Sequence, residues 1–458
     1  MFLVWYHSTM RFIPRQFLIL ITACSLQESY FLTICKKNDS SVIFFIALYI
    51  KERHGPFQRA LGRNLKRMNN SSKKEDLPKE EDIRFILSSV KDWSDQMLRP
   101  ALDKSLPDGD RTMWREAIDE LYELGLIFYP DPASEGYEMG IWGAFTEVLG
   151  TKYSLWILTE IAQTCATASS LVHWQGIAAS CILQAENLGG RELKRIAFAF
   201  QDAEGMPPAG SLLHSEMRAW KGFETRALPC DNGYELSGRK TFVYMQEECR
   251  ALIVPARLNE EWAVFLVPLK AVGLHLVDPG QRTGLRYLKL RHVHFEKVGL
   301  SRDALIAAGK AAEEMILRTW TLNWLGIAAI ARGVALGSLQ IAGQYAAERY
   351  QGGTEIKNHD AIWNLLSDAR SSLEMAGDLI EKTAEMDFGI PQLRASARLK
   401  LKLVDECSRV VSDMMQVLGG YGYMEDFGIE KRLRDIQVLK LGNGSPLYLK
   451  RFIYESGK

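Results

Sequence analysis

The sequence predicts a multidomain α+β protein with an N-terminal α-helical domain, a central antiparallel β domain and a C-terminal helical domain. Three observations predict this order. Apolar residues recur at helical spacing from about residue 80 to residue 195, then in short runs between turn signals, and again at helical spacing from Glu313 onward. The 458 residues suffice for two to three domains with large cores. The expected domains are 68–195, 196–305 and 306–458.

Residues 1–67 differ in character from the rest and are predicted to be an upstream extension outside these domains. Their apolar runs, Phe17–Ile21 and Val42–Ile50, are shorter than the roughly 20 apolar residues that span a bilayer, so no transmembrane helix is expected. Arg11 and Arg15 before the first run imitate a secretion signal. We prefer the interpretation that the ordinary polar N-terminus begins at Met68.

Composition excludes several classes of partner. Lysine and arginine number 56, and aspartate and glutamate also number 56, so bulk charge favours neither nucleic acid nor an anionic membrane surface. The seven cysteines are scattered without Cys-x-x-Cys spacing, which indicates reduced thiols rather than a disulfide framework. We therefore expect a cytoplasmic protein.

The N-terminal domain is predicted to consist of amphipathic helices. Ile83, Ile86, Leu87 and Val90 lie at helical spacing, and Pro100 is expected to end this helix. The other predicted helices span Arg111–Leu124, Trp142–Leu149, Leu155–Ala162 and Ala168–Glu186.

Short apolar runs separated by turn residues predict the strands of the β domain. Asp231-Asn232-Gly233 and Glu260-Glu261 fall between such runs, as expected for hairpins. The predicted strands are Ile196–Phe200, Ala219–Thr225, Tyr234–Ser237, Thr241–Tyr244, Ala251–Ala256, Ala263–Pro268, Leu274–Val277 and Leu290–Phe295.

The C-terminal domain is predicted to be helical to the end of the chain. Gly419, Gly420 and Gly422 end one helical pattern and let the backbone pass close to a bulky group. A second glycine turn, Gly442–Ser445, precedes the last helix, and the two turns would allow the chain to close over a flat cofactor. The predicted helices are Glu313–Gln351, Asp360–Glu385, Pro391–Leu418 and Leu447–Tyr454.

The closing segment resembles the flavin-dependent acyl-CoA dehydrogenase family. The run Gln416–Tyr423 matches the family pattern Gln-x-x-Gly-Gly-x-Gly-[Tyr/Phe], and Glu430 with Arg434-Asp435 matches the Glu-x-x-x-Arg-Asp helix that follows it. The resemblance covers about residues 80–455. It implies a C-terminal four-helix bundle that builds a homo- or heterotetramer, FAD as cofactor, an acyl-CoA substrate, an electron-transferring flavoprotein as partner and a place in fatty acid metabolism.

The resemblance fails at the residue that would act as base. In the family a Glu-Gly-Thr turn follows, and its glutamate abstracts the α-proton, whereas this chain has Asn443-Gly444-Ser445. Some members carry the glutamate on the first long helix of the bundle, where this chain has Asn323. An amide cannot accept a proton at neutral pH. Losing a positioned base costs about 10²- to 10⁴-fold in rate, or roughly 3–5 kcal/mol.

Three explanations of the missing base remain open. Another group could replace it, and His173 lies in a stretch whose family counterpart lines the acyl pocket, with Asp131 in the loop before it. A histidine between apolar neighbours on a helix is, however, more often a satisfied core residue. The chain could also be the base-lacking, non-catalytic subunit of a heteromeric dehydrogenase, or a member whose thioester chemistry needs no α-proton abstraction.

Several residues match the family's cofactor contacts. Arg349 matches an arginine that contacts the FAD pyrophosphate of a neighbouring subunit, a task that suits a guanidinium because it forms bidentate bonds to phosphate. The other interpretation of Arg349 is a solvated residue at a helix C-terminus. Gln416, Gly419 and Gly420 match residues on the adenine-ribose side, and Ser445 stands where a threonine contacts the cofactor.

The β domain matches the family's flavin contacts less closely. The loop that hydrogen-bonds the isoalloxazine corresponds to Gln201–Gly205, and the strand that stacks on the flavin corresponds to Phe242–Met245. Within that strand Phe242 keeps an aromatic face and Tyr244 a hydroxyl. Gly284-Leu285-Arg286 matches a largely structural part of the family.

Other chemistries find no support in the sequence. It contains no His-Glu-x-x-His, Gly-x-Ser-x-Gly or phosphate-binding Gly-x-x-x-x-Gly-Lys-[Ser/Thr] motif, and we expect no metal site. Glu425 and Asp426 follow a glycine turn, where acids usually cap the next helix. The sequence therefore predicts an acyl-CoA dehydrogenase-like FAD oxidoreductase that acts on the α,β bond of a CoA thioester.

Overall fold

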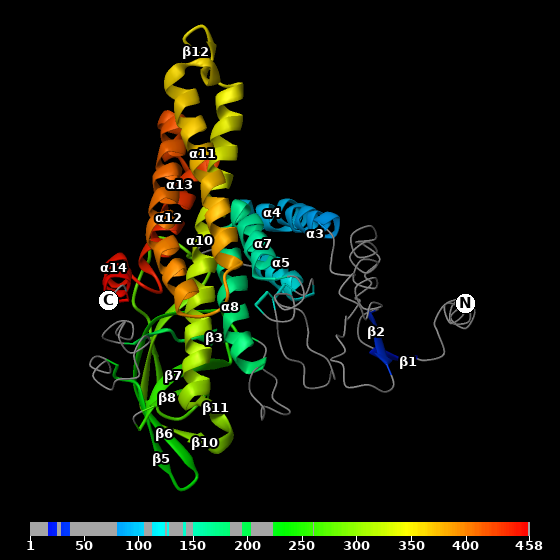
Figure 1. The fold of residues 1–458 in the computed structure, drawn as a ribbon. Coiled ribbons are helices and arrows are strands. Elements are labelled where there is room, and N and C mark those ends of the chain that lie inside the picture. Colours follow the sequence, from blue (N-terminus) through cyan, green and yellow to red (C-terminus); the bar gives the residue numbers. More distant parts are fainter. Residues whose placement is uncertain are drawn as a thin grey trace, which may run out of the picture.

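The computed structural model describes residues 17–24, 29–36, 80–104, 112–123, 126–127, 141–142, 150–183, 195–202, 223–259 and 261–456. Helices, a sheet and a second group of helices follow one another along these residues, as predicted. In Figure 1 the long C-terminal helices stand side by side above the sheet, and helices α7 and α8 lie between them and the rest of the N-terminal part.

The N-terminal helices lie close to their predicted positions, with one exception. A π-turn, η4 (Ser94–Leu98), connects α3 (Glu80–Trp93) directly to α4 (Arg99–Lys104). The predicted stop at Pro100 is therefore wrong, because the π-turn shifts the backbone hydrogen bonds just ahead of the proline. Asp131 and residues 143–149 of a predicted helix lie outside the described residues. The other helices are α5 (Thr112–Glu123), α7 (Thr151–Thr164) and α8 (Ala166–Leu183).

The central domain is one mainly antiparallel sheet. Its described strands run in the order β11-β8-β7-β5-β6-β10-β9, with β3 beside β7 and β4 beside β6. Strand β7 also pairs in parallel with β3 and β5, which the prediction of an antiparallel domain missed. The strands are β3 (Ile196–Phe198), β4 (Gln201–Asp202), β5 (Arg226–Cys230), β6 (Gly233–Met245), β7 (Ala251–Leu258), β8 (Glu261–Pro268), β9 (Leu274–Val277), β10 (Lys289–Ser301) and β11 (Leu305–Ala308).

Strand β6 positions the residues that the sequence assigns to a cofactor. Val243 and Met245 belong to a small core formed within the sheet, whereas Tyr244 packs against the main core formed with the helices. This alternation follows from the two-residue period of a strand. A register irregularity between Arg291 and Val293 of β10 lies opposite the same stretch of β6. The sheet therefore presents Tyr244 toward the helices.

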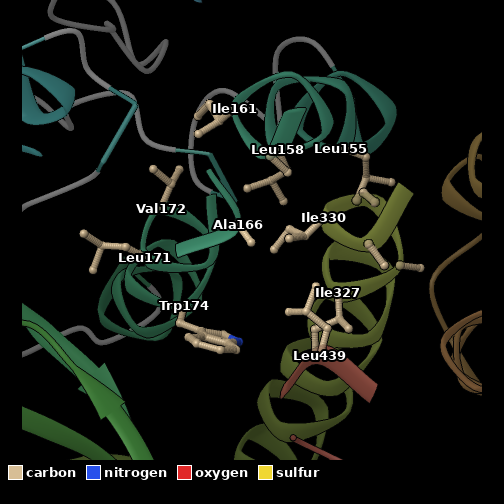
Figure 2. Packing of buried hydrophobic residues seen from close by; sticks show 14 of the residues in the cluster. Leu155, Leu158, Ile161, Ala166, Leu171, Val172, Trp174, Ile327, Ile330 and Leu439 are labelled. Atoms are coloured by element: carbon tan, nitrogen blue, oxygen red, sulfur yellow. The ribbon is translucent and has the colours of Figure 1, made fainter. Parts of the chain in front are cut away.

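The C-terminal helices pack around α10 (Gly309–Glu348). By length and composition α10 could cross a membrane, but 72% of its most apolar window is buried inside the protein, as in the core helix of a bundle. Figure 2 shows Leu158 of α7 and Ile330 of α10 in the interior between their helices, and Trp174 on the side of α8 that faces Ile327. The remaining elements are β12 (Tyr350–Gln351), β13 (Thr354–Glu355), α11 (Asp360–Ala384), α12 (Ile390–Val417), α13 (Ile429–Leu441) and α14 (Pro446–Glu455).

A close contact joins the bundle to the sheet. A methyl group on Gly284 would lie 2.5 Å from the carbonyl oxygen of Arg434 in α13, so only glycine fits there. The carboxylate of Asp435 accepts a hydrogen bond from the N–H of Leu285 at 2.7 Å. The segment Gly284–Arg286, which resembles a structural segment of the family, thus has a structural role here, as predicted.

Two further strands lie in the extension. Strands β1 (Phe17–Cys24) and β2 (Ser29–Lys36) pair antiparallel in a sheet of their own. A single hairpin is marginally stable by itself. The prediction that 1–67 lie outside the three domains stays a prediction, and Arg11, Arg15 and Met68 lie outside the described residues.

Candidate active site

The turn between α13 and α14 is held from two sides by the bundle. Asn443 has a φ of 49°, in the left-handed region that asparagine tolerates. Its carbonyl oxygen accepts hydrogen bonds from Nε1 of Trp324 at 2.9 Å and from Nζ of Lys400 at 3.2 Å. Trp324 belongs to α10 and Lys400 to α12. The position of the family's base is therefore fixed in the core, although it carries an amide.

Lys400 is a functional candidate that the sequence analysis missed. Its buried ammonium also donates to the carbonyl oxygens of Gly442 and Gly444, so three acceptors surround it. Burial lowers the pKa of Lys400 to about 7, whereas the three carbonyls stabilise the charged form. A signal was present in the sequence, because Lys400 falls on the apolar stripe of α12 between Ala397 and Val404.

The alternative base position, Asn323, lies in the same region. Its Oδ1 accepts a hydrogen bond from Nε1 of Trp174 at 3.2 Å, and its Nδ2 has no partner among the described residues. The next residue, Trp324, holds the backbone of Asn443. The two positions where the family would carry its glutamate, Asn323 and Asn443, therefore lie close to the same turn of α10.

His173 is enclosed in the core with both ring nitrogens engaged. Nε1 of Trp142 donates to Nδ1 at 2.9 Å, which places the ring proton on Nε2, and Nε2 donates to the carbonyl oxygen of Asn323 at 3.2 Å. Burial lowers the pKa of His173 to about 3. This geometry favours the interpretation of a satisfied core residue over that of a base.

A small hollow lies where α8 meets the end of β6. The rings of Trp174 and Tyr244 stack with centroids 4.7 Å apart and an interplanar angle of 20°. Beside them Gln175 and Gln246 line a cavity of about 10 Å³, which is the space of a single water molecule. Burial raises the pKa of Tyr244 to about 12, so its hydroxyl stays protonated at neutral pH.

Phe242 has a different environment although it lies two residues before Tyr244. Half of its side chain is exposed, and its φ of 53° marks the irregular part of β6. Its N–H donates to Nδ1 of His292 at 3.3 Å, and the two rings meet edge to face. Phe242 therefore offers a partly exposed aromatic ring on the same strand as Tyr244.

The predicted isoalloxazine loop begins with a structural residue. Asp202 is buried and pairs with the equally buried Lys240 at 3.3 Å. Its carboxylate also accepts the backbone N–H groups of Glu224 and Thr225. Residues 203–205 of this loop lie outside the described residues.

The other group of predicted contacts gathers at the far end of α10. Arg349 is exposed at the C-terminus of this helix. One turn earlier, Tyr345 packs against Tyr421 of the glycine turn at 6.2 Å between ring centroids. Gly419 and Gly420 are exposed, and a methyl group on either would meet no atom within 4 Å. The exposed arginine and the uncovered backbone turn thus form one corner of the bundle, with Gln416 exposed nearby.

The two groups of contacts lie far apart on one chain. Trp324 and Arg349 are 25 residues apart, which is about 37 Å along a helix that rises about 1.5 Å per residue. Ser445 lies with Asn443, and its Oγ accepts the N–H of Tyr448 as the N-cap of α14. The structure therefore joins the last turn of α10, which precedes Arg349, to the glycine turn through Tyr345 and Tyr421, and it places Ser445 and Asn443 elsewhere.

The described residues include groups that fit both ends of a flavin dinucleotide, the nucleoside end and the flavin ring. The corner at Arg349 offers a guanidinium and open backbone to a pyrophosphate and nucleoside. On strand β6, Phe242 offers a partly exposed ring to a planar group. Among the described residues, no group of three or more His, Cys, Asp or Glu side chains could hold a metal ion.

The chain is similar to known acyl-CoA dehydrogenases in sequence and in fold. Residues 314–457 match the family model of the acyl-CoA dehydrogenase C-terminal domain. A probable acyl-CoA dehydrogenase of Bacillus subtilis is 25% identical over 382 residues, which cover 81% of this chain and 96% of that protein. Subunit CarC of the caffeyl-CoA reductase-Etf complex of Acetobacterium woodii is 26% identical over 258 residues, 55% of this chain and 65% of that protein. The structure of butyryl-CoA dehydrogenase from Megasphaera elsdenii has a TM-score of 0.66 at 21% identity, covering 82% of this chain and 97% of that one.

Proposed function

Because the chain belongs to the acyl-CoA dehydrogenase family, we propose that it is an FAD-dependent oxidoreductase acting on the α,β bond of a CoA thioester. The observation that carries the proposal is the corner where Arg349 lies beside the uncovered turn Gly419-Gly420. At this corner Arg349 is exposed, and no atom of the described chain covers Gly419 or Gly420. The corner suits the phosphate and nucleoside of a dinucleotide.

When bound, the flavin would accept a hydride from the β-carbon of the thioester. The chain's own residues have distinct tasks. Arg349 pairs with the pyrophosphate, and Gln416 and the glycine turn accommodate the nucleoside. Phe242 contacts the flavin ring from the sheet, and Ser445 supplies a hydroxyl beside the turn that carries Asn443.

The separation of the two contact groups supports an oligomer. About 37 Å of helix lies between Trp324 and Arg349, more than a single dinucleotide spans. In this proposal Arg349 of one chain therefore completes the FAD site of a neighbouring chain in a homo- or heterotetramer. The four exposed side chains Tyr421, Tyr423, Met424 and Phe427 around the glycine turn support contact with another chain at this corner.

The electron acceptor in this proposal is an electron-transferring flavoprotein, supported by the similarity to a subunit of an Etf-containing complex. We place the protein in the cytoplasm, because the described cysteines are free and Cys165, Cys181 and Cys407 are buried. A role in fatty acid metabolism follows only if the acyl group is an ordinary fatty acyl chain.

A second candidate function is a non-catalytic subunit that completes the FAD site of a base-bearing partner. It is favoured by one observation: Asn443 and Asn323 both carry amides, and the nitrogens of His173 are engaged. In this case the Arg349 corner would still serve a neighbour. The chain itself would then not abstract the α-proton.

Purification of the chain expressed alone separates the two functions. We expect a yellow oligomer that contains one FAD per chain and reduces an artificial electron acceptor in the presence of an acyl-CoA. A colourless chain that gains FAD only when mixed with a base-bearing relative would support the subunit function instead. A chain that takes up flavin under neither condition would contradict both.

A further inference from the structure

One of the residues that line the hollow beside Trp174 and Tyr244 has a buried polar atom that the described residues do not satisfy. Gln175 of α8 is 2% exposed, and its Oε1 accepts a hydrogen bond from Nε2 of Gln246 at 3.1 Å. Its own Nε2, however, has no partner among the described residues, and Gln175 is one of the residues that line the hollow. A buried N–H without an acceptor is destabilising, because it loses its bond to water and gains nothing in return.

The neighbouring hydrogen bonds assign the oxygen and the nitrogen of the Gln175 amide. Nε2 of Gln246 donates both to Oε1 of Gln175 and to the hydroxyl oxygen of Tyr122, the latter at 2.6 Å. Burial raises the pKa of Tyr122, so this hydroxyl remains neutral at physiological pH. With Oε1 occupied by Gln246, the N–H group of Gln175 is the donor that remains for a ligand in the hollow.

The lining determines what kind of acceptor fits. Leu171, Ile196 and Leu288 surround the amide with apolar surface, and none of the described lining residues is charged. A carboxylate would enter without a cation to balance it, which disfavours an acidic acyl group. The cavity of about 10 Å³ also admits only about one oxygen-sized group.

We propose that Gln175 donates a hydrogen bond to an uncharged oxygen atom on the acyl group of the substrate, so that the site selects hydroxy- or oxo-acyl thioesters over plain alkyl ones. This inference rests on the proposed function, because it assigns the hollow to the acyl group of a CoA thioester. Tyr244, which lines the hollow and lies on the strand assigned to the flavin, connects the two sites.

Calorimetric binding of matched thioesters to the protein as purified, under anaerobic conditions and without an electron acceptor, tests the inference without continuous turnover. The probes are butyryl-CoA and its 2-, 3- and 4-hydroxy derivatives, with the 3-oxo derivative as a second acceptor. We expect at least one oxygenated thioester to bind about tenfold or more tightly than butyryl-CoA, the discrimination typical of one buried hydrogen bond. Equal affinity for all five would overturn the inference.

Variants test whether Gln175 is the donor. Gln175→Leu should reduce the preference for the oxygenated thioester by about tenfold and leave the affinity for butyryl-CoA unchanged or higher. Gln175→Met, of similar length, should also lose the preference because a thioether cannot donate a hydrogen bond. Gln163→Leu, on the neighbouring helix α7 and outside the hollow, is the matched control and should keep the wild-type ratio. A preference that survives in Gln175→Leu would contradict the assignment.

The outcomes also separate this inference from the proposed function. If butyryl-CoA binds as well as its oxygenated derivatives and still bleaches the flavin, the dehydrogenase function stands and the role of Gln175 fails. If no CoA thioester binds to protein that elutes as a single folded species, the proposed function fails. The comparison of wild-type affinities needs no variant, so misfolding of Gln175→Leu would not prevent the test.

Discussion

The indole N–H of Trp142 donates to Nδ1 of His173 across 2.9 Å. Since Nδ1 is then an acceptor, the ring proton lies on Nε2, where the carbonyl oxygen of Asn323 receives it. The same ring lies against α10 so closely that a methyl group on Gly326 would be 2.1 Å from its Cε1. His173 thus connects three segments of the core, and its nitrogens are not available to a substrate.

Gly326→Ala should lower the free energy of unfolding by about 1–3 kcal/mol, because the added methyl group forces His173 out of its place. The same substitution at Gly343, also in α10 but with no atom within 4 Å of the new methyl, should stabilise the protein by about 0.5–1 kcal/mol. Urea unfolding of both variants measures the difference. Equal effects would show that the His173 ring is not tightly packed.

Asp202→Asn should destabilise the protein by about 3–5 kcal/mol, because it leaves the buried ammonium of Lys240 without its counter-charge. The double variant Asp202→Asn/Lys240→Met should be more stable than the single one. Glu455→Gln, which breaks the exposed pair with Arg451, is the control and should change the free energy of unfolding by less than about 1 kcal/mol. Similar losses of stability in Asp202→Asn and Glu455→Gln would contradict the importance of the buried ion pair.

Lys400 should make stability depend on pH. Burial lowers its pKa from 10.5 to about 7, so between these values the unfolded chain binds a proton that the folded chain has released. Stability contributed by this group therefore rises with pH across the window from 7 to 10.5, by at most about 1.4 kcal/mol per pH unit, and is constant below it. Unfolding at pH 7 and pH 9 should show a smaller rise in Lys400→Met than in the wild type. An unchanged rise would mean that the three carbonyls keep Lys400 charged throughout.

Arg349→Ala should weaken FAD retention by about 10- to 100-fold, as expected for the loss of a charge-assisted contact to phosphate. Arg349→Lys should retain FAD better than Arg349→Ala but less well than the wild type, because an ammonium cannot form the bidentate pair. Gel filtration followed by the flavin-to-protein absorbance ratio measures retention. Arg370→Ala on α11 is the control, and an equal loss there would contradict the assignment of Arg349.

Asn443→Glu should raise the rate of α,β-dehydrogenation by about 10²- to 10⁴-fold, because it restores a base on a turn that Trp324 and Lys400 already hold in place. Asn443→Gln has nearly the same shape and no basicity, and it should give no gain. Single-turnover reduction of the flavin by an acyl-CoA is the appropriate measurement. No difference between the two variants would show that the pocket has diverged in more than its base.

The order of domains and the helix positions were predictable because they depend on the period of apolar residues within each segment. The split of β6 into two strands was wrong for a local reason. Gly238 resembles a turn residue, but it lies inside the continuous strand β6. Its lack of a side chain lets the backbone at Thr225 approach closely, since a methyl group on Gly238 would lie 2.5 Å from Cα of Thr225.

The site was less predictable than the fold because its polar contacts join distant segments. Arg349 and the glycine turn were assigned from local motifs, and a contact between Tyr345 and Tyr421 joins the end of α10 to that turn. The pairing of Gln175 with Gln246, 71 residues apart, has no local signal. Lys400 interrupts an apolar stripe and could have been found, but its three carbonyl acceptors lie more than 40 residues away in sequence.

The most direct test is the visible spectrum of the purified chain during anaerobic titration with the CoA thioesters named above. The account predicts a flavin band that at least one thioester bleaches, with the absorbance returning when an electron-transferring flavoprotein is added. A chain that remains colourless after reconstitution with FAD, alone and with a base-bearing relative, would contradict it.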